Sequence, residues 1–229
     1  RRSLGSFFVC AACLALVSAC GPRSADPVPY DPGMETDPNA TNKVKPLDFE
    51  GKLPADAEVE GTLQTAFGWT DKYGRNAVVV GKAEAANGDA TTTRLVADYI
   101  LWEGSAWTLQ KRLEEKVTEC QFDTELVALT GAWSVTDLDA DGRGEATIAW
   151  RAGCRSDVSP VSHQVLMIRS NDAGSVDQYV LRGNTKVDSG GGVVEGGDYN
   201  TDPIFDTAPQ VFRDHALKVW KETATEKMR

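Results

Sequence analysis

The residues with the clearest chemical potential lie in the segment 137–145, whose sequence is DLDADGRGE. Carboxylates occupy its first, third, fifth and ninth positions, and alternate residues of a tight loop can point to one centre. Gly142 allows the positive φ that folds such a loop back. Ca²⁺ prefers roughly six to eight oxygen ligands in flexible geometry, whereas Mg²⁺ demands a tighter octahedron. The pattern predicts a structural calcium site, whose expected ligands are Asp137, Asp139, Asp141, the carbonyl of Arg143, and Glu145.

The residues that follow the ninth position separate two kinds of calcium loop. An EF-hand needs a bidentate Glu at the twelfth loop position, which here is Ile148, inside an expected strand. An acid at the ninth position followed by a strand instead resembles the calcium loops of FG-GAP-type β-propeller repeats. That resemblance covers residues 136–150 and implies loop chemistry rather than a propeller. The alternative is a turn without metal, whose carboxylates point into water. Convergent carboxylates would repel, by about 4 kcal/mol for a pair at about 4 Å and an effective dielectric of about 20.

Cysteines and histidines suggest further chemistry. Cys120 and Cys154 are expected to form a disulfide if the protein is exported to an oxidising compartment, and two buried thiols are the alternative. The chain has two histidines, so a zinc site is disfavoured. Residues 154–163 contain the Ser, His and Asp of a hydrolase triad, but the Gly-x-Ser-x-Gly elbow is missing. Turn and cap residues explain that composition better, so no catalytic residue is assigned.

The first twenty residues have the pattern of a bacterial export signal. Two arginines precede an apolar run over residues 7–17. A run of this length is too short for a membrane-spanning helix of about 20 residues and fits a signal-peptide core. The sequence VSACG at 17–21 resembles a lipobox, which implies cleavage of 1–19 and lipidation of Cys20. A plain secretory signal cleaved near Ala19 is the alternative. The expected location is the cell envelope, on the outer membrane, facing the periplasm or the surface.

The net charge and the glycine spacing argue against nucleic acids and nucleotides as partners. The formal net charge is −10 and the pI is about 4.7, which disfavours nucleic-acid binding because phosphate contacts need a basic face. The glycine-rich stretch 189–197 is expected to be a mobile loop. Glu195 stands where a phosphate-binding loop needs a third glycine, so nucleotide binding is not expected.

One domain is expected after a tether. Seven of the ten prolines lie between Pro22 and Pro54, and proline favours extended chain, so we assign residues 20–56 to the lipidated cysteine and a disordered tether. Residues 57–229 are expected to form a single α+β domain, mainly of antiparallel strands with a C-terminal helix. The expected strands cover 61–69, 77–80, 91–102, 107–113, 146–150, 164–168 and 178–181, and 111–117 suits either a strand or a helix.

The C-terminal helix is expected to begin near Pro209, with Thr207 as its cap. An apolar stripe at helical spacing should pack on the sheet; it comprises Phe212, Ala216, Leu217, Val219 and Trp220. Four tryptophans are candidates to stack on sugar rings, although burial in the core explains most of them better; these are Trp69, Trp102, Trp107 and Trp133.

Several segments resemble bacterial exported lipoproteins labelled as surface polysaccharide biosynthesis proteins. The matching segments are 69–76, 120–123, 136–142, 154–160, 179–183 and 212–220. The label names a process rather than a reaction. We therefore expect a non-enzymatic, calcium-binding envelope lipoprotein that acts in surface-polysaccharide biosynthesis or assembly. Its expected partners are the membrane, through the lipid anchor, and a surface glycan or an envelope protein. A periplasmic hydrolase and a protein-interaction or inhibitor module are the alternatives.

Overall fold

The computed structural model describes residues 44–50, 52–188 and 194–227. The signal-like segment with Cys20, most of the expected tether and residues 189–193 of the glycine-rich stretch lie outside the described residues. Within the described ranges, no helix has both the length and the apolar character needed to cross a bilayer.

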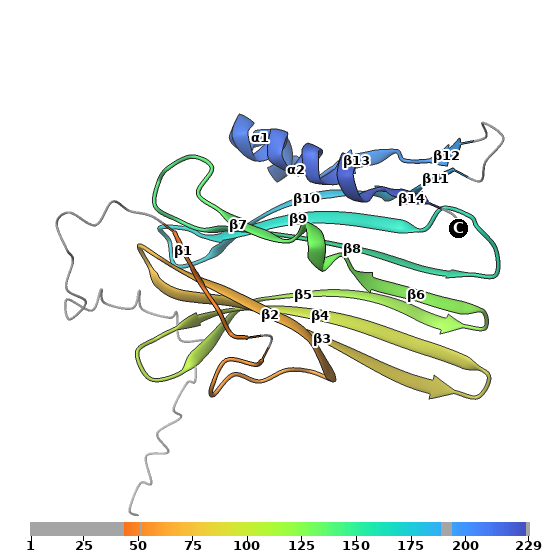
Figure 1. Ribbon diagram of the computed structural model, residues 1–229, viewed down its shortest axis with the longest axis horizontal. Helices are drawn as coiled ribbons and strands as arrows, with labels where there is room; N and C mark the ends of the chain where they lie inside the picture. The colour runs from red at the N-terminus through yellow and green to blue at the C-terminus, as the bar shows by residue number, and fades with distance from the viewer. Residues whose placement is uncertain (1–43, 51, 189–193, 228–229) are drawn as a thin grey trace, which may run out of the picture.

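Two antiparallel sheets form the body of the protein (Figure 1). The first sheet has the order β1-β2-β3-β4-β5, with β1 at Lys45–Leu47, β2 at Thr62–Asp71, β3 at Gly74–Asn87, β4 at Ala90–Trp102 and β5 at Trp107–Cys120. The second has the order β13-β10-β9-β8-β6, with β7 also paired to β8. Its strands are β6 at Asp123–Ala128, β7 at Ser134–Thr136, β8 at Glu145–Arg155, β9 at Ser162–Ser170, β10 at Val176–Asn184 and β13 at Tyr199–Thr201.

Shorter elements complete the described chain. A small sheet has the order β12-β11-β14, with β11 at Lys186–Asp188, β12 at Val194–Gly196 and β14 at Thr225–Lys227. The helices are the 3₁₀ turn η1 at Thr130–Ala132, α1 at Pro203–Thr207 and α2 at Gln210–Thr223. Figure 1 shows α1 and α2, the second sheet and the first sheet as successive layers. The prediction of an α+β fold dominated by antiparallel strands is therefore confirmed.

The main core lies between the two sheets, and both sheets are also covered on their outer faces. In β3, Val78 and Val80 belong to the central core, whereas Ala77 and Val79 join a second cluster on the outer face. Alternate side chains of a strand point to opposite faces, so burial of both faces explains the continuous apolar run of this strand. Hydrophobic side chains from the segment before β2 pack against the outer cluster; they include Phe49, Leu53, Ala57 and Val59.

A strand and several packed side chains lie within the segment 20–56 that was expected to be a disordered tether. β1 pairs antiparallel with β2, with Pro46 opposite Trp69, and the segment that follows carries apolar side chains onto the first sheet. A proline-rich composition favours extended chain, and an edge strand is also extended chain. Composition alone therefore could not separate β1 from a tether.

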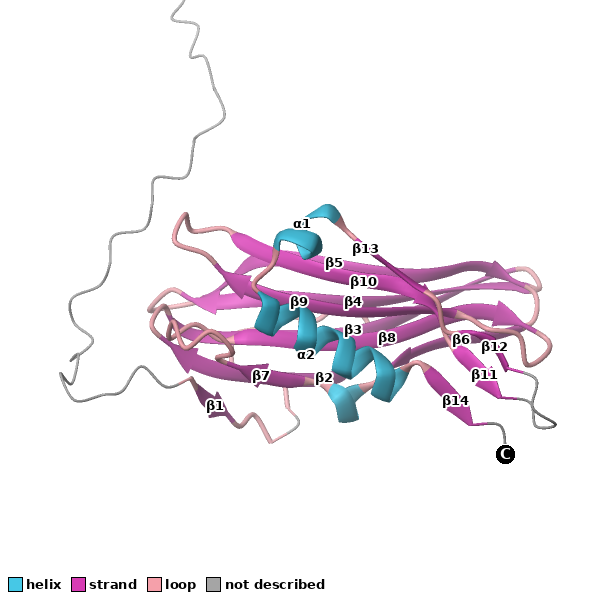
Figure 2. Cartoon of the chain, turned by 90° about the horizontal axis from the view of Figure 1, so that it is seen from above, coloured by secondary structure: helices cyan, strands magenta, loops and turns pink. Residues whose placement is uncertain are grey.

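Helix α2 covers the outer face of the second sheet (Figure 2). Its predicted stripe is confirmed, because Phe212, Ala216, Val219 and Trp220 are buried and Leu217 packs against them. The helix begins next to Pro209, as predicted, but its cap differs from the prediction. Pro209 is the N-cap residue without a side-chain cap bond. Thr207 ends the short helix α1, whose own cap is Asp202 accepting a hydrogen bond from the Phe205 amide.

The predicted disulfide between Cys120 and Cys154 is present. Cys120 ends β5 in the first sheet and Cys154 lies near the end of β8 in the second, so the bond ties the two sheets together. The segment 111–117, ambiguous between strand and helix, is part of β5. There Leu113 and Val117 face the core, and charged neighbours such as Glu114 point outward.

Replacing both Cys120 and Cys154 by alanine should lower the free energy of unfolding by roughly 3–4 kcal/mol. The bond joins cysteines separated by 34 positions in the sequence, and the closed loop limits the conformational freedom of the unfolded chain. Urea titration of the variant and of the untreated protein measures the difference, and reduction of the untreated protein should reproduce it. Equal unfolding midpoints for the oxidised and reduced protein would contradict this expectation.

Candidate metal centre

Four carboxylates meet in the loop between β7 and β8. Each of Asp137, Asp139, Asp141 and Glu145 offers one oxygen, and these four oxygens all lie within 4.8 Å of one another. This is the convergence that the alternating sequence predicts, not a loop whose acids point apart. The group could therefore hold a metal ion.

The loop backbone turns these side chains inward. Gly142 has a φ of 81°, as its predicted role requires, and Ala140 also lies in the left-handed region at 58°. Asp137 accepts a hydrogen bond from the Gly142 amide at 3.2 Å, and Asp141 accepts one from the Arg143 amide at 2.9 Å. The carboxylates are thus held over the loop's own N–H groups.

Glu145 is the anchor of the cluster because it is buried, with an exposed fraction of 0%. Its Oε2 accepts a hydrogen bond from the Leu138 amide at 2.8 Å. Its Oε1 is also buried but accepts no hydrogen bond. Burial, together with the charges of Asp139 and Asp137, raises the pKa of Glu145 to about 7. A buried carboxylate oxygen without a donor is costly, and a cation at this point would satisfy it.

The turn between β2 and β3 supports the acidic loop from the other sheet. Asp71 Oδ2 accepts hydrogen bonds from Trp69 Nε1 and from the Gly144 amide, both at 3.0 Å. Lys72 donates from its amide to Gly142 O and from Nζ to Asp141 O, both at 3.1 Å. A Cβ at position 144 would lie 2.2 Å from Trp69 Nε1, so the close contact requires glycine. The sequence patterns did not predict this support, because it comes from a turn about 70 residues away along the chain.

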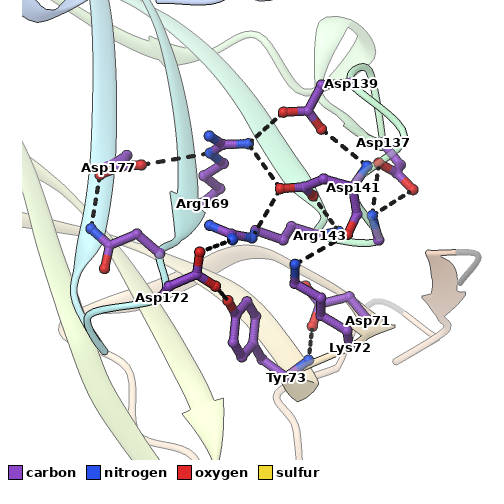
Figure 3. A network of polar contacts seen from close by, with 12 residues as sticks. Asp71, Lys72, Tyr73, Asp137, Asp139, Asp141, Arg143, Arg169, Asp172 and Asp177 are labelled. Atoms are coloured by element: carbon purple, nitrogen blue, oxygen red, sulfur yellow. Dashed lines mark hydrogen bonds and ion pairs between the residues drawn. The ribbon is translucent and has the colours of Figure 1, made fainter.

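Two arginines surround the carboxylates (Figure 3). Arg143 Nε lies 3.0 Å from Asp141 Oδ2, and its Nη2 donates to Asp172 Oδ2 at 2.5 Å. Arg169 Nη1 lies 2.9 Å from Asp139 Oδ2, 3.6 Å from Asp141 Oδ2 and 3.7 Å from Glu145 Oε1. Arg169 was not predicted from the sequence. For Arg143 the sequence predicted a role of its backbone carbonyl as a ligand, and that role stays a prediction.

The serine and histidine residues of 154–163 point to different partners. Ser159 Oγ donates to Asp157 Oδ1 at 2.5 Å. His163 is fully buried beneath Trp220, where its Nδ1 donates to Trp150 O at 3.0 Å and its Nε2 lies 2.9 Å from Thr223 Oγ1. Both ring nitrogens are thus engaged away from Ser159. A shallow hollow of about 400 Å³ lies beside Ser159 and Arg155.

A larger groove of about 620 Å³ borders the acidic loop. Phe67, Trp133, Leu47 and Asp137 are among its lining residues. The tryptophans considered for sugar stacking are Trp69, which is fully buried, and Trp102, Trp107 and Trp133, which are partly buried. Trp133 donates from Nε1 to Ala149 O at 2.9 Å, so the polar edge of this ring is satisfied inside the protein.

In metal-free protein, Glu145→Gln should raise stability more at pH 7.5 than at pH 5. The folded pKa of about 7 exceeds the ordinary value of 4.5, so the folded state keeps a proton that the unfolded chain has released. Between these values the stability of the parent protein falls as pH rises. The gain from the substitution should therefore grow by about 2 kcal/mol between pH 5 and pH 7.5. Urea titrations with chelator at both pH values measure this growth.

The parent protein must be compared with the variant because His163 also changes the stability in this pH range. Its effect on the stability has the opposite dependence on pH. Burial lowers its pKa to about 4, so its contribution to stability is lost as pH falls from about 6.5 toward that value. The parent protein's own profile therefore mixes both groups, whereas the difference between the two proteins isolates Glu145. An identical difference at pH 5 and pH 7.5 would show that the Glu145 carboxylate ionises normally.

Comparisons with known proteins add no match. No family model matches the chain, and neither the curated proteins nor the solved structures contain one that does.

Proposed function

We propose that this protein is a calcium-binding lipoprotein of the bacterial envelope, with a binding and structural role rather than a catalytic one. The observation that carries the calcium assignment is the buried Oε1 of Glu145. It accepts no hydrogen bond and lies in the cluster with oxygens of Asp137, Asp139 and Asp141. A divalent ion at this centre would supply the missing partner for Glu145 and offset the repulsion among the four charges.

The donor set favours calcium over other metals. The cluster is made of carboxylate oxygens, and we assign the Arg143 carbonyl as a further ligand from the loop pattern. Hard oxygen donors suit Ca²⁺, whereas zinc and copper favour nitrogen and sulfur. The flexible coordination of Ca²⁺ also suits a loop, while Mg²⁺ needs a near-ideal octahedron.

A structural role follows from the contacts of the loop. Its backbone is hydrogen-bonded to Asp71 and Lys72, at the turn between β2 and β3 of the first sheet. Glu145 begins β8 in the second sheet. An ion that stabilises the loop would therefore stabilise the junction of both sheets.

Calcium should raise the Tm by on the order of 5–10 °C at a concentration about 100 times its Kd. Binding to the folded state alone adds about 2.7 kcal/mol there, and this converts to such a shift for a domain of this size. Thermal melts with chelator and with added calcium measure the shift, and calorimetric titration gives the affinity. Magnesium should bind at least tenfold more weakly.

Matched variants locate the site. Asp139→Asn and Glu145→Gln should each weaken calcium binding at least tenfold. Asp89→Asn removes an exposed carboxylate from the turn between β3 and β4 and should leave the affinity within twofold. Melts of the parent protein that are the same in chelator and in millimolar calcium would remove the metal assignment.

The location in the envelope is supported by the N-terminal sequence. Residues 17–21 resemble a lipobox, and the proline-rich segment after Cys20 suits a domain held off a membrane. The disulfide is also typical of exported proteins. The resemblance of six segments to surface polysaccharide biosynthesis lipoproteins supports a role in assembling or maintaining a surface polysaccharide. The partner would be the glycan itself or an envelope protein.

Cys20→Ala should abolish incorporation of labelled fatty acid when the full chain is expressed, with an initiator methionine, in a bacterial host. Cys13→Ala, which lies in the segment expected to be removed, should leave incorporation unchanged. Labelling followed by gel electrophoresis measures the result. Undiminished labelling of the Cys20 variant would reject lipidation at this residue.

A further inference from the structure

Arg169 contacts the same carboxylates that the proposed ion would bind. One guanidinium nitrogen, Nη1, faces Asp139, Asp141 and Glu145 at 2.9, 3.6 and 3.7 Å. Figure 3 shows the side chain of Arg169 reaching from β9 toward the loop, between Asp177 on one side and the aspartates on the other. The positive charge of Arg169 thus already offsets part of the charge of the cluster.

The strand register fixes Arg169 in this place. Arg169 is the cross-strand partner of Asp177 on β10. On its other side, β8 and β9 pair Ala146 with Ile168, so Glu145 and Arg169 are the next residues along that ladder. The ring of Phe212 from α2 lies 4.7 Å from the guanidinium carbon. The side chain is only 12% exposed, so it cannot simply move into water without losing these contacts.

A divalent ion and this guanidinium cannot share the three oxygens without strong repulsion. Calcium binds oxygen at about 2.3–2.6 Å. An ion bound to the oxygens that face Nη1 would lie close to that nitrogen. The ion and the guanidinium would then be two cations on the same side of the cluster. Arg143 is in a different position, because among the four carboxylates it pairs with Asp141, and its Nη2 is bonded to Asp172. Arg169 is therefore the direct competitor of the ion.

Arg169 also has a second acidic partner outside the cluster. Its Nε lies 3.6 Å from Asp177 Oδ2, beyond hydrogen-bond distance, and Nε is buried without a hydrogen-bond partner. The other oxygen of Asp177 accepts a hydrogen bond from Asn171 Nδ2 at 2.9 Å, which holds the carboxylate in place. A small displacement of the guanidinium toward Asp177 would complete that ion pair as the cluster is vacated.

We propose that Arg169 is an internal counter-cation that competes with calcium for the carboxylates and thereby sets the calcium affinity. This inference rests on the proposed calcium site and concerns its regulation. Without metal, Arg169 holds the acidic loop together. When calcium binds, Arg169 moves to Asp177, and because it stacks on Phe212 the change reaches α2. The metal-free loop is then folded and preorganised, at the cost of a lower affinity.

Calcium titration of the metal-depleted full chain tests the competition. Arg169→Gln should lower the Kd for calcium at least tenfold, while lowering the Tm of the metal-free protein. Arg94→Gln removes the same charge from β4 in the first sheet, where Arg94 pairs with Glu60 and Glu114, and should change the Kd by less than twofold. An unchanged or higher Kd for Arg169→Gln would overturn the proposal, because Arg169 would then support the site.

A second variant keeps the test decisive if Arg169→Gln does not fold without metal. Asp177→Asn removes the acceptor for the displaced arginine, so it should raise the Kd for calcium at least threefold although Asp177 is not a ligand. In an Arg169→Gln background, folded with calcium present and then titrated with a competing chelator, Asp177→Asn should have no effect beyond twofold. Such a double-mutant cycle isolates the coupling between the two residues. An equal loss in both backgrounds would overturn the proposal.

The calcium site and the competition by Arg169 would fail in different ways. If neither the parent protein nor Arg169→Gln binds calcium, the proposed metal site is wrong. If both bind calcium with the same affinity, the site stands and the competition is wrong.

Discussion

Mutual repulsion among four carboxylates is the constraint around which this end of the protein is built. Their oxygens lie within 4.8 Å of one another, and the most deeply placed, from Glu145, is fully buried. Two negative charges at about 4 Å repel by about 4 kcal/mol at an effective dielectric of about 20. A proton on Glu145 or positive charge from neighbouring groups must therefore accompany the folded loop. Arg169 and Arg143 supply part of it, and the proposed calcium ion would supply more.

The two sheets make that arrangement rigid. The acidic loop leaves and re-enters the second sheet, while Asp71 and Lys72 hold its backbone from the first. At β5 and β8 the disulfide between Cys120 and Cys154 provides a second tie between the sheets. Helix α2 covers the outer face and places Phe212 on Arg169. The loop is therefore connected to every layer of the sandwich, which is what a structural ion site needs.

The sequence predicted the parts of the structure that depend on local patterns. The carboxylates of the loop lie at fixed short spacings, so their convergence could be expected from Gly142 and the alternation alone. The strands and the buried stripe of α2 could likewise be predicted from the spacing of apolar residues along the sequence. Arg169 and Asp71 could not be found, because strand register brings them to the loop from distant positions. The first strand was also missed, since Pro46 suits a tether as well as an edge strand.

Native mass spectrometry tests the central claim most directly, because it counts the ions bound to the folded chain. The account predicts that the protein, exchanged into volatile buffer with micromolar calcium, carries one tightly held Ca²⁺ per chain. That ion should be absent from the double variant Asp139→Asn, Glu145→Gln at the same calcium concentration. A parent protein that carries no more calcium than this variant would contradict the account.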